Sequence, residues 1–556
     1  MRSPSAKNLQ VHPDMPRLRA AVRERSGLRL DERHLTWEVL LQELAAAQLQ
    51  GRRTCTPLEA RTLLATEAAA LGPTPFGDFV HEPAFARAAL EAVLALEGGG
   101  LDAAALQAAV EQLPAERRPR LRVLARLFHA YRQRLAALGL ADREDLLRAA
   151  REGLERGRWP AAWAGVRRVH LRGLHDAPPS TLALLLALAA GCERAGALLE
   201  VELLAGGSAA ADAALAPIFR AFERLGEASS HVELAKAELG FEGRPFTGLA
   251  RAAFDPRLPA GALSGVQGLS VFRAATGEEE ARLIAREVRR LLQQGAAPEG
   301  IAVAWRGLGP ELRWVGEALQ ELGVPSRAPF AEPLATVGAV RLALELPLLV
   351  EEGFPVERVV ALLDGRYAAA LAPSVPHAPA TLLAEAGVRD DRVGAVGTRG
   401  AYEVRLEALA RRHAREPLRA HAIRVLKERC LRLIALCREL PAEAPAAAQL
   451  EAWWHCVRAL GLTDTEGPAG DAAPAGPALA RAAQDARERD DAARAALEAR
   501  VEALRRALRL AQGGPRLTRR QLARWLRASV QDVHLPARGA AAARAVELLE
   551  VSGLPG

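Results

Sequence analysis

Residues 269–325 read LSVFRAATGEEEARLIAREVRRLLQQGAAPEGIAVAWRGLGPELRWVGEALQELGVP, and this stretch decides the predicted fold. A short apolar strand is expected at Leu269–Arg273. It leads to Thr276, and Glu279 follows at the spacing of a capping box, which satisfies free amides at a helix start. A second strand is expected at Ile301–Trp305, before a second amphipathic helix. This strand–helix–strand–helix order predicts a parallel sheet.

Length and composition set the broad class. The chain has 556 residues, half of them hydrophobic, which is enough for several folded domains and is typical of a globular protein. The net charge of +7 suits a polyanionic partner. Nearly all of the positively charged residues are arginine, in a composition rich in alanine, leucine and glycine. Net charge alone is therefore weak evidence, because a nucleic-acid surface needs basic residues gathered on one face.

Cysteine usage and hydropathy indicate a reduced, cytoplasmic setting. The five cysteines are odd in number and scattered, which disfavours a disulfide framework and matches no zinc or iron–sulfur spacing. We therefore expect buried free thiols. The longest apolar run, Leu182–Ala190, is too short to span a bilayer, so no membrane partner is expected.

The quoted stretch also carries a family resemblance. A helix that begins with EEEA, the strand IAVAWR and a helix that ends in LGVP resemble the second motor domain of UvrD-like superfamily 1 helicases. Within that superfamily the chain is most similar to the B subunit of AddAB-type helicase–nucleases, which process double-strand DNA breaks. Residues Pro329–Tyr367 continue the similarity, so that it covers about 100 residues well.

The resemblance implies a helix-rich α/β fold. Two degenerate RecA-like domains, of the P-loop NTPase class, would each carry an α-helical insertion, and the second domain would be truncated. A strand at Val546–Val551 would resume that second domain, so we expect the chain to be the front portion of such a subunit, without its PD-(D/E)XK nuclease. The expected parts are a first RecA-like domain (1–80 and 160–262), its helical insertion (81–159), the start of the second domain (265–332), the second insertion (333–543) and the returning strand (544–556).

The resemblance also implies a nucleotide site that is only vestigial. Trp305 and Arg306 would contact a base and a γ-phosphate, and Glu280 holds the matching acidic position upstream. However, none of the three lysines lies in a phosphate-binding loop, G-x-x-x-x-G-K-[ST], or in the E-x-K motif of the nuclease. The family uses ATP and Mg²⁺, and in some members an iron–sulfur cluster, but we expect no cofactor, metal site or catalytic residue in this chain. The alternative is that Trp305 packs and that Arg306 is solvated or bonded to backbone.

Runs of arginine nominate contacts to DNA phosphates. The last run interleaves arginine with an aromatic ring, a pattern compatible with binding a single strand through charge and stacking. An earlier run lies at Arg132–Arg134, and the alternative for any one run is a solvated helix face. The residues of the last run are Arg519, Arg520, Arg524, Trp525 and Arg527.

Two functions remain open from the sequence. The first is a helicase-like, DNA-binding part of an AddB-type subunit in double-strand break processing and recombinational repair. Its partners would be duplex ends, single-stranded DNA and an AddA-type motor and nuclease subunit. The second is a non-catalytic scaffold or protein-interaction module that keeps only the helicase-like fold. The resemblance is to an ATP-dependent helicase and exodeoxyribonuclease, whereas the motifs for both activities are missing, so enzymatic activity stays an open question.

Overall fold

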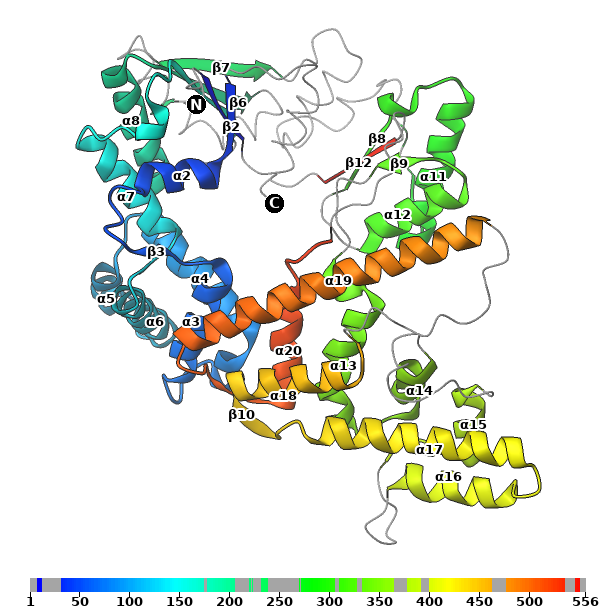
Figure 1. Cartoon of the computed structure of the whole chain (residues 1–556). Helices are drawn as coiled ribbons and strands as arrows, with labels where there is room; N and C mark the ends of the chain where they lie inside the picture. Colours follow the sequence, from blue (N-terminus) through cyan, green and yellow to red (C-terminus); the bar gives the residue numbers. More distant parts are fainter. Residues whose placement is uncertain are drawn as a thin grey trace, which may run out of the picture.

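The fold is that of a computed structural model. Figure 1 shows the course of the chain, which is helix-rich and contains parallel β-sheets, as expected for an α/β protein. The structure describes residues 8–12, 32–174, 178–205, 220–221, 223, 232–238, 270, 272–305, 310–327, 333–364, 378–391, 400–462, 477–535 and 546–550.

The first sheet has five parallel strands, whose order across the sheet is β2 (Glu32–Thr36), β1 (Asn8–His12), β5 (Arg168–Leu174), β6 (Leu198–Ala205) and β7 (Val232–Glu238). Three helices cover one face of it, α2 (Trp37–Ala45), α7 (Arg143–Glu155) and α8 (Pro179–Ala195). Side chains alternate between the faces of a strand, so Leu9 and Val11 join that apolar layer. Gln10, on the opposite face, is polar and buried.

A helical region follows the second strand of this sheet. Its elements are β3 (Arg53–Thr54), α3 (Pro57–Ala69), η1 (Gly77–His81), α4 (Pro83–Gly98), α5 (Ala103–Gln112), α6 (Arg118–Ala137) and β4 (Leu140–Ala141), with α7 after them and η2 (Ala161–Trp163) before β5. Leu63 and Leu64 of α3 are fully buried in one core with residues of α4 and α6. Helix α3 therefore belongs to the same bundle as the helices expected from residue 81 onward.

The second sheet contains the quoted stretch. Its elements are α11 (Gly277–Gln293), η3 (Pro298–Gly300), β8 (Ala302–Trp305), α12 (Pro310–Glu321), β9 (Ser326–Arg327) and β12 (Val546–Glu550). Strand β12 lies between β8 and β9 and is parallel to both. The strand expected at Val546–Val551 is thus present over its described residues, Val546–Glu550, and the chain returns to this sheet more than 200 residues after leaving it.

Local details of the quoted stretch differ in part from expectation. The strand expected at Leu269–Arg273 is wrong for its described residues, because Ser270, Phe272 and Arg273 are outside any strand and Phe272 is 62% exposed. The central place in the sheet belongs to β12 instead. Thr276 does cap α11, since its hydroxyl accepts a hydrogen bond from the amide of Glu279 at 3.2 Å. The Glu279 carboxylate accepts the amide of Ala275, one residue before the expected partner.

A second, larger helical region separates β9 from β12. Its elements are η4 (Leu334–Thr336), α13 (Gly338–Glu352), α14 (Val356–Asp364), α15 (Pro379–Ala386), α16 (Ala401–Arg412), α17 (Pro417–Arg438), β10 (Glu443–Pro445), α18 (Ala446–Ala459), α19 (Pro477–Leu510), β11 (Arg516–Thr518) and α20 (Arg519–Val530). These helices share the largest core of the protein. Helices α16 and α17 lie side by side as a hairpin that extends from the bundle (Figure 1).

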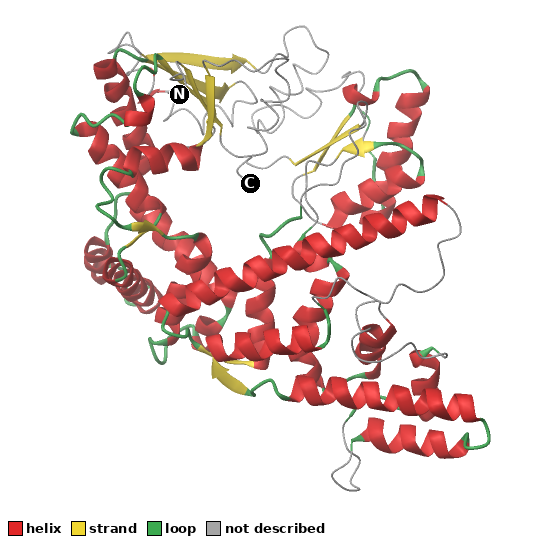
Figure 2. Cartoon of the chain, in the orientation of Figure 1, coloured by secondary structure: helices red, strands yellow, loops and turns green. Residues whose placement is uncertain are grey.

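The two helical regions pack against each other through α3. Leu58 of α3 belongs to the core of the second region, and Ala511, just after α19, belongs to the core of the first. Figure 2 shows the result: helices, with two short two-stranded sheets among them, lie between the two larger groups of strands. Helix α20 lies at this junction, in contact with α4 of the first region and α13 of its own.

Candidate nucleic-acid interface

Helix α20 presents the arginine run that the sequence nominated. Thr518 caps it, and a complete capping box with Gln521 forms, as its sequence predicts. Its apolar residues face the core of the second helical region. The spacing of i, i+4 and i+7 then places Arg520, Arg524 and Arg527 together on the exposed side.

Arg519 has a structural role. Its Nε and Nη2 atoms donate to the carbonyl oxygen of Leu440 at 3.0 and 2.6 Å, and its Nη1 lies 3.4 Å from the Glu351 carboxylate. These bonds tie the start of α20 to the chain between α17 and β10. Arg519 is therefore not among the arginines that α20 offers to a ligand.

The exposed arginines keep much of their surface in solvent. Arg520 lies 3.7 Å from a Glu351 oxygen, and Arg524 pairs with Glu82 at the start of α4. The Arg520 and Arg524 side chains are nevertheless 64% and 58% exposed, and Arg527 is exposed as well. Exposed ion pairs contribute little to stability, so a phosphate can compete for these guanidinium groups.

The position of the arginines on α20 also argues for a role outside the helix. Its first turn contains no acidic residue but carries Arg519 and Arg520. The amino end of a helix holds partial positive charge, which disfavours cations there. Helix stability alone would therefore select acids at these positions, as in the first turn of α11, which has Glu278, Glu279 and Glu280.

Trp525 differs from what the sequence suggested. Its side chain is 8% exposed and packs in the core of the second helical region. The indole is thus not displayed on the outer face of α20 beside the arginines. It does, however, line a cavity between α20, α3 and α4.

Two arginines of neighbouring helices form contacts at the end of α20. Arg61 of α3 forms a 2.8 Å ion pair with Asp532, and Arg500 of α19 donates to the carbonyl oxygen of Ser529. Burial and the nearby charge of Arg61 lower the pKa of Arg500 below its ordinary value. These contacts tie α3 and α19 to the end of α20.

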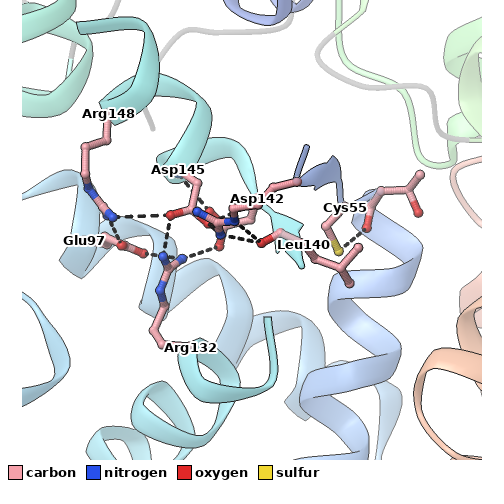
Figure 3. A network of polar contacts seen from close by, with 9 residues as sticks. Cys55, Glu97, Arg132, Leu140, Asp142, Asp145 and Arg148 are labelled. Carbon is pink, nitrogen blue, oxygen red and sulfur yellow. Dashed lines mark hydrogen bonds and ion pairs between the residues drawn. The ribbon is translucent and has the colours of Figure 1, made fainter. Parts of the chain in front are cut away.

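The earlier arginine run forms ion pairs inside the protein, and Figure 3 shows Arg132 within a network of polar contacts. Arg132 of α6 lies 3.1 Å from Asp142 and also bonds Asp145, and both carboxylates are buried. Burial works against the charge of Arg132, but the two aspartates outweigh it and raise its pKa. Arg134 pairs with Glu67 at 2.9 Å. This run holds the first helical region together instead of facing solvent.

Other members of the same network complete the charge balance. Arg52 donates to Asp145 at 2.7 Å, and Arg148 pairs with both Asp145 and Glu97. Burial opposes the charge of Asp145, but the bonds from Arg132 lower its pKa below the ordinary value. The sequence reasoning missed this network, although the capping pattern around Asp142 was a signal that the acids lie at a helix start.

The vestigial nucleotide site is described only in part. Glu280 is exposed in the first turn of α11, and Trp305 is the last residue of β8. Arg306 lies outside the described residues. The expected stacking and phosphate contacts therefore stay predictions.

Two further surveys cover the described part of the chain. No group of three or more histidine, cysteine or acidic residues there is arranged to hold a metal ion. All five cysteines are buried and free, as predicted. No single described helix has the length and apolar composition to cross a membrane, although the bent pair of α4 and α5 passes that test together.

Comparison with known proteins adds no relative. No family model matches the chain, and the curated proteins contain no match to it.

Proposed function

We propose that this chain is the helicase-like, DNA-binding part of an AddB-type subunit of a helicase–nuclease, and that it binds the DNA backbone through α20. The observation that carries the proposal is the exposed row of Arg520, Arg524 and Arg527, with no acid on the same helix. Four arginines and no acidic residue give α20 a net charge of +4. A cationic helix face of this kind fits successive phosphates of a nucleic acid.

The layout of the chain supports the family part of the proposal. The two larger parallel sheets lie in one chain, and each is interrupted by a helical region. The strand β12 rejoins its sheet after the second interruption. In this proposal the protein acts with an AddA-type motor subunit during break processing, and it contributes binding without hydrolysing ATP.

The salt dependence of DNA binding tests the proposal. Labelled single-stranded and duplex oligonucleotides would be titrated with the protein by fluorescence anisotropy across a series of salt concentrations. We expect log affinity to fall linearly with log salt, because phosphate contacts release counterions. Absence of binding, or binding that is indifferent to salt, would refute the DNA-binding function. DNA-stimulated ATP hydrolysis would refute the non-catalytic part.

A scaffold is the second candidate, and one observation favours it. Two ion pairs, Arg524 with Glu82 and Arg61 with Asp532, cross the junction between the helical regions. In this alternative the arginines of α20 serve to hold the regions together. Removing their charge would then lower the free energy of unfolding, and the wild-type protein would not bind DNA. Denaturation measurements and the DNA titration described above distinguish this outcome from the first proposal.

A further inference from the structure

The cavity beside Trp525 lies at the junction of the two helical regions. Its volume is about 110 Å³, and it is partly open to solvent. We call it the α3–α20 cavity. Its wall includes Leu58 and Ala65 from α3, Val80 from η1, Leu517 from β11, and Trp525 and Ala528 from α20.

The wall and the rim of this cavity have opposite character. The wall residues are mostly apolar and include an indole ring. We call its charged lining residues, Arg61, Arg87 and Glu82, the rim. Glu82 holds the guanidinium of Arg524, and Arg61 pairs with Asp532. An apolar wall below a cationic rim fits a ligand that joins a flat apolar ring to a negative charge.

The size of the cavity limits what it accepts. An apolar cavity of about 150 Å³ holds one benzene molecule, so the smaller α3–α20 cavity takes at most one ring, part of which stays at its open side. Arg524, the middle member of the row, reaches the rim through its ion pair with Glu82. Charge complementarity therefore favours a polyanion that carries rings at regular intervals.

We infer that the α3–α20 cavity receives one nucleobase of a single strand whose phosphates lie along the arginines of α20. The inference rests on the proposed DNA-binding function. A base inside a duplex is paired and stacked, so it would have to leave its partner, whereas a single strand offers its bases freely. The chain should therefore prefer a single strand that carries bases to the same backbone without them.

The test compares two oligonucleotides with the same number of phosphates. One is oligo(dT), and the other replaces each nucleotide with an abasic residue. Stacking of a base on an aromatic side chain contributes about 1–3 kcal/mol, so the wild-type protein should bind oligo(dT) about tenfold more tightly at one salt concentration. Equal binding of the two would overturn the inference and leave DNA binding intact. No binding to either would overturn both.

A cavity-filling variant locates the effect. Ala528→Leu adds volume from the wall contributed by α20, and it should reduce the preference for oligo(dT) to less than twofold with an unchanged salt slope. Ala408→Leu, on the exposed side of α16, is the matched control and should keep the tenfold preference. Full preference in Ala528→Leu would overturn the inference.

A spectroscopic measurement keeps the test decisive if Ala528→Leu does not fold. A base that enters the cavity should quench the fluorescence of Trp525, and Trp525→Phe should lose that part of the quenching while it keeps an aromatic wall. The same quenching in wild type and Trp525→Phe would place the base elsewhere and overturn the inference.

Discussion

Helices α6 and α20 are both rich in arginine, yet their surroundings differ. Helix α6 has six arginines and no acid of its own, and α20 has four arginines and no acid. In α6, Arg132 and Arg134 meet buried or half-buried carboxylates from α7, α4 and α3. In α20, three arginines are exposed, and among the described residues they pair with two acids, Glu351 of α13 and Glu82 before α4. The acids brought by the fold, and not the arginines themselves, decide which run is open to a ligand.

This difference separates two uses of the same residue. A guanidinium surrounded by buried carboxylates is part of the structure, because removing it leaves uncompensated charge. A guanidinium on an open helix face contributes little to stability and is available to phosphate. Variants that change the charges around each helix separately therefore test the comparison.

Replacing Arg132 should have the largest effect. Arg132→Met removes the charge that faces Asp142 and Asp145 and leaves both aspartates buried. We expect a loss of about 3 kcal/mol in the free energy of unfolding, measured by urea denaturation. Arg126→Met, at an exposed position of the same helix, is the control and should change it by less than about 0.5 kcal/mol. Equal effects of the two would remove the contrast between the helices.

The pH dependence of the same network comes next. The pKa of Asp145 is lower in the folded protein than its ordinary value of 3.8, so the folded state binds this proton less tightly than the unfolded state does. The stabilisation is therefore fully present above pH 3.8 and is lost as the pH falls through the folded pKa. The difference in unfolding free energy between wild type and Asp145→Asn should shrink as the pH is lowered from 5 to 3. A constant difference would mean that Asp145 does not act through its charge.

Removing the exposed charges of α20 should change binding and not stability. In the triple variant Arg520→Gln, Arg524→Gln and Arg527→Gln, affinity for a single strand should fall about tenfold at moderate salt. Its salt slope should decrease by about 2, since each phosphate contact to a single strand contributes about 0.7. Anisotropy titration measures both quantities.

Helix α11 supplies a matched control for that variant. Arg282, Arg286 and Arg289 have the same spacing and are exposed, but α11 also has four glutamates, so that its four arginines leave no net charge. Replacing these three arginines by glutamine should change affinity by less than twofold. A similar loss from both helices would show that α20 is not a dedicated surface.

The sequence predicted local structure better than it predicted the use of charged residues. Periodicity and caps determine each helix from its own residues, so Thr276 and Thr518 were placed correctly as caps. Strand β1 was missed, because Leu9 and Val11 alone give too short an alternation in a polar segment. The burial of Trp525 depends on the tertiary core that surrounds it. The pairing of Arg132 depends on acids of other helices, such as Glu97 and Asp145, and no spacing rule within one helix predicts it.

Arg520 alone gives the smallest effect and the finest distinction between the two proposed functions. Its place in the first turn of α20 is unfavourable by about 0.3–1 kcal/mol, and its exposed pair with Glu351 returns a similar small amount. Arg520→Gln should therefore leave the thermal midpoint unchanged or slightly raised, measured by circular dichroism, while DNA affinity falls two- to threefold. A cation that costs the helix stability and improves binding is explained by a ligand. A marked drop in the midpoint with unchanged binding would instead make Arg520 a structural residue and favour the scaffold.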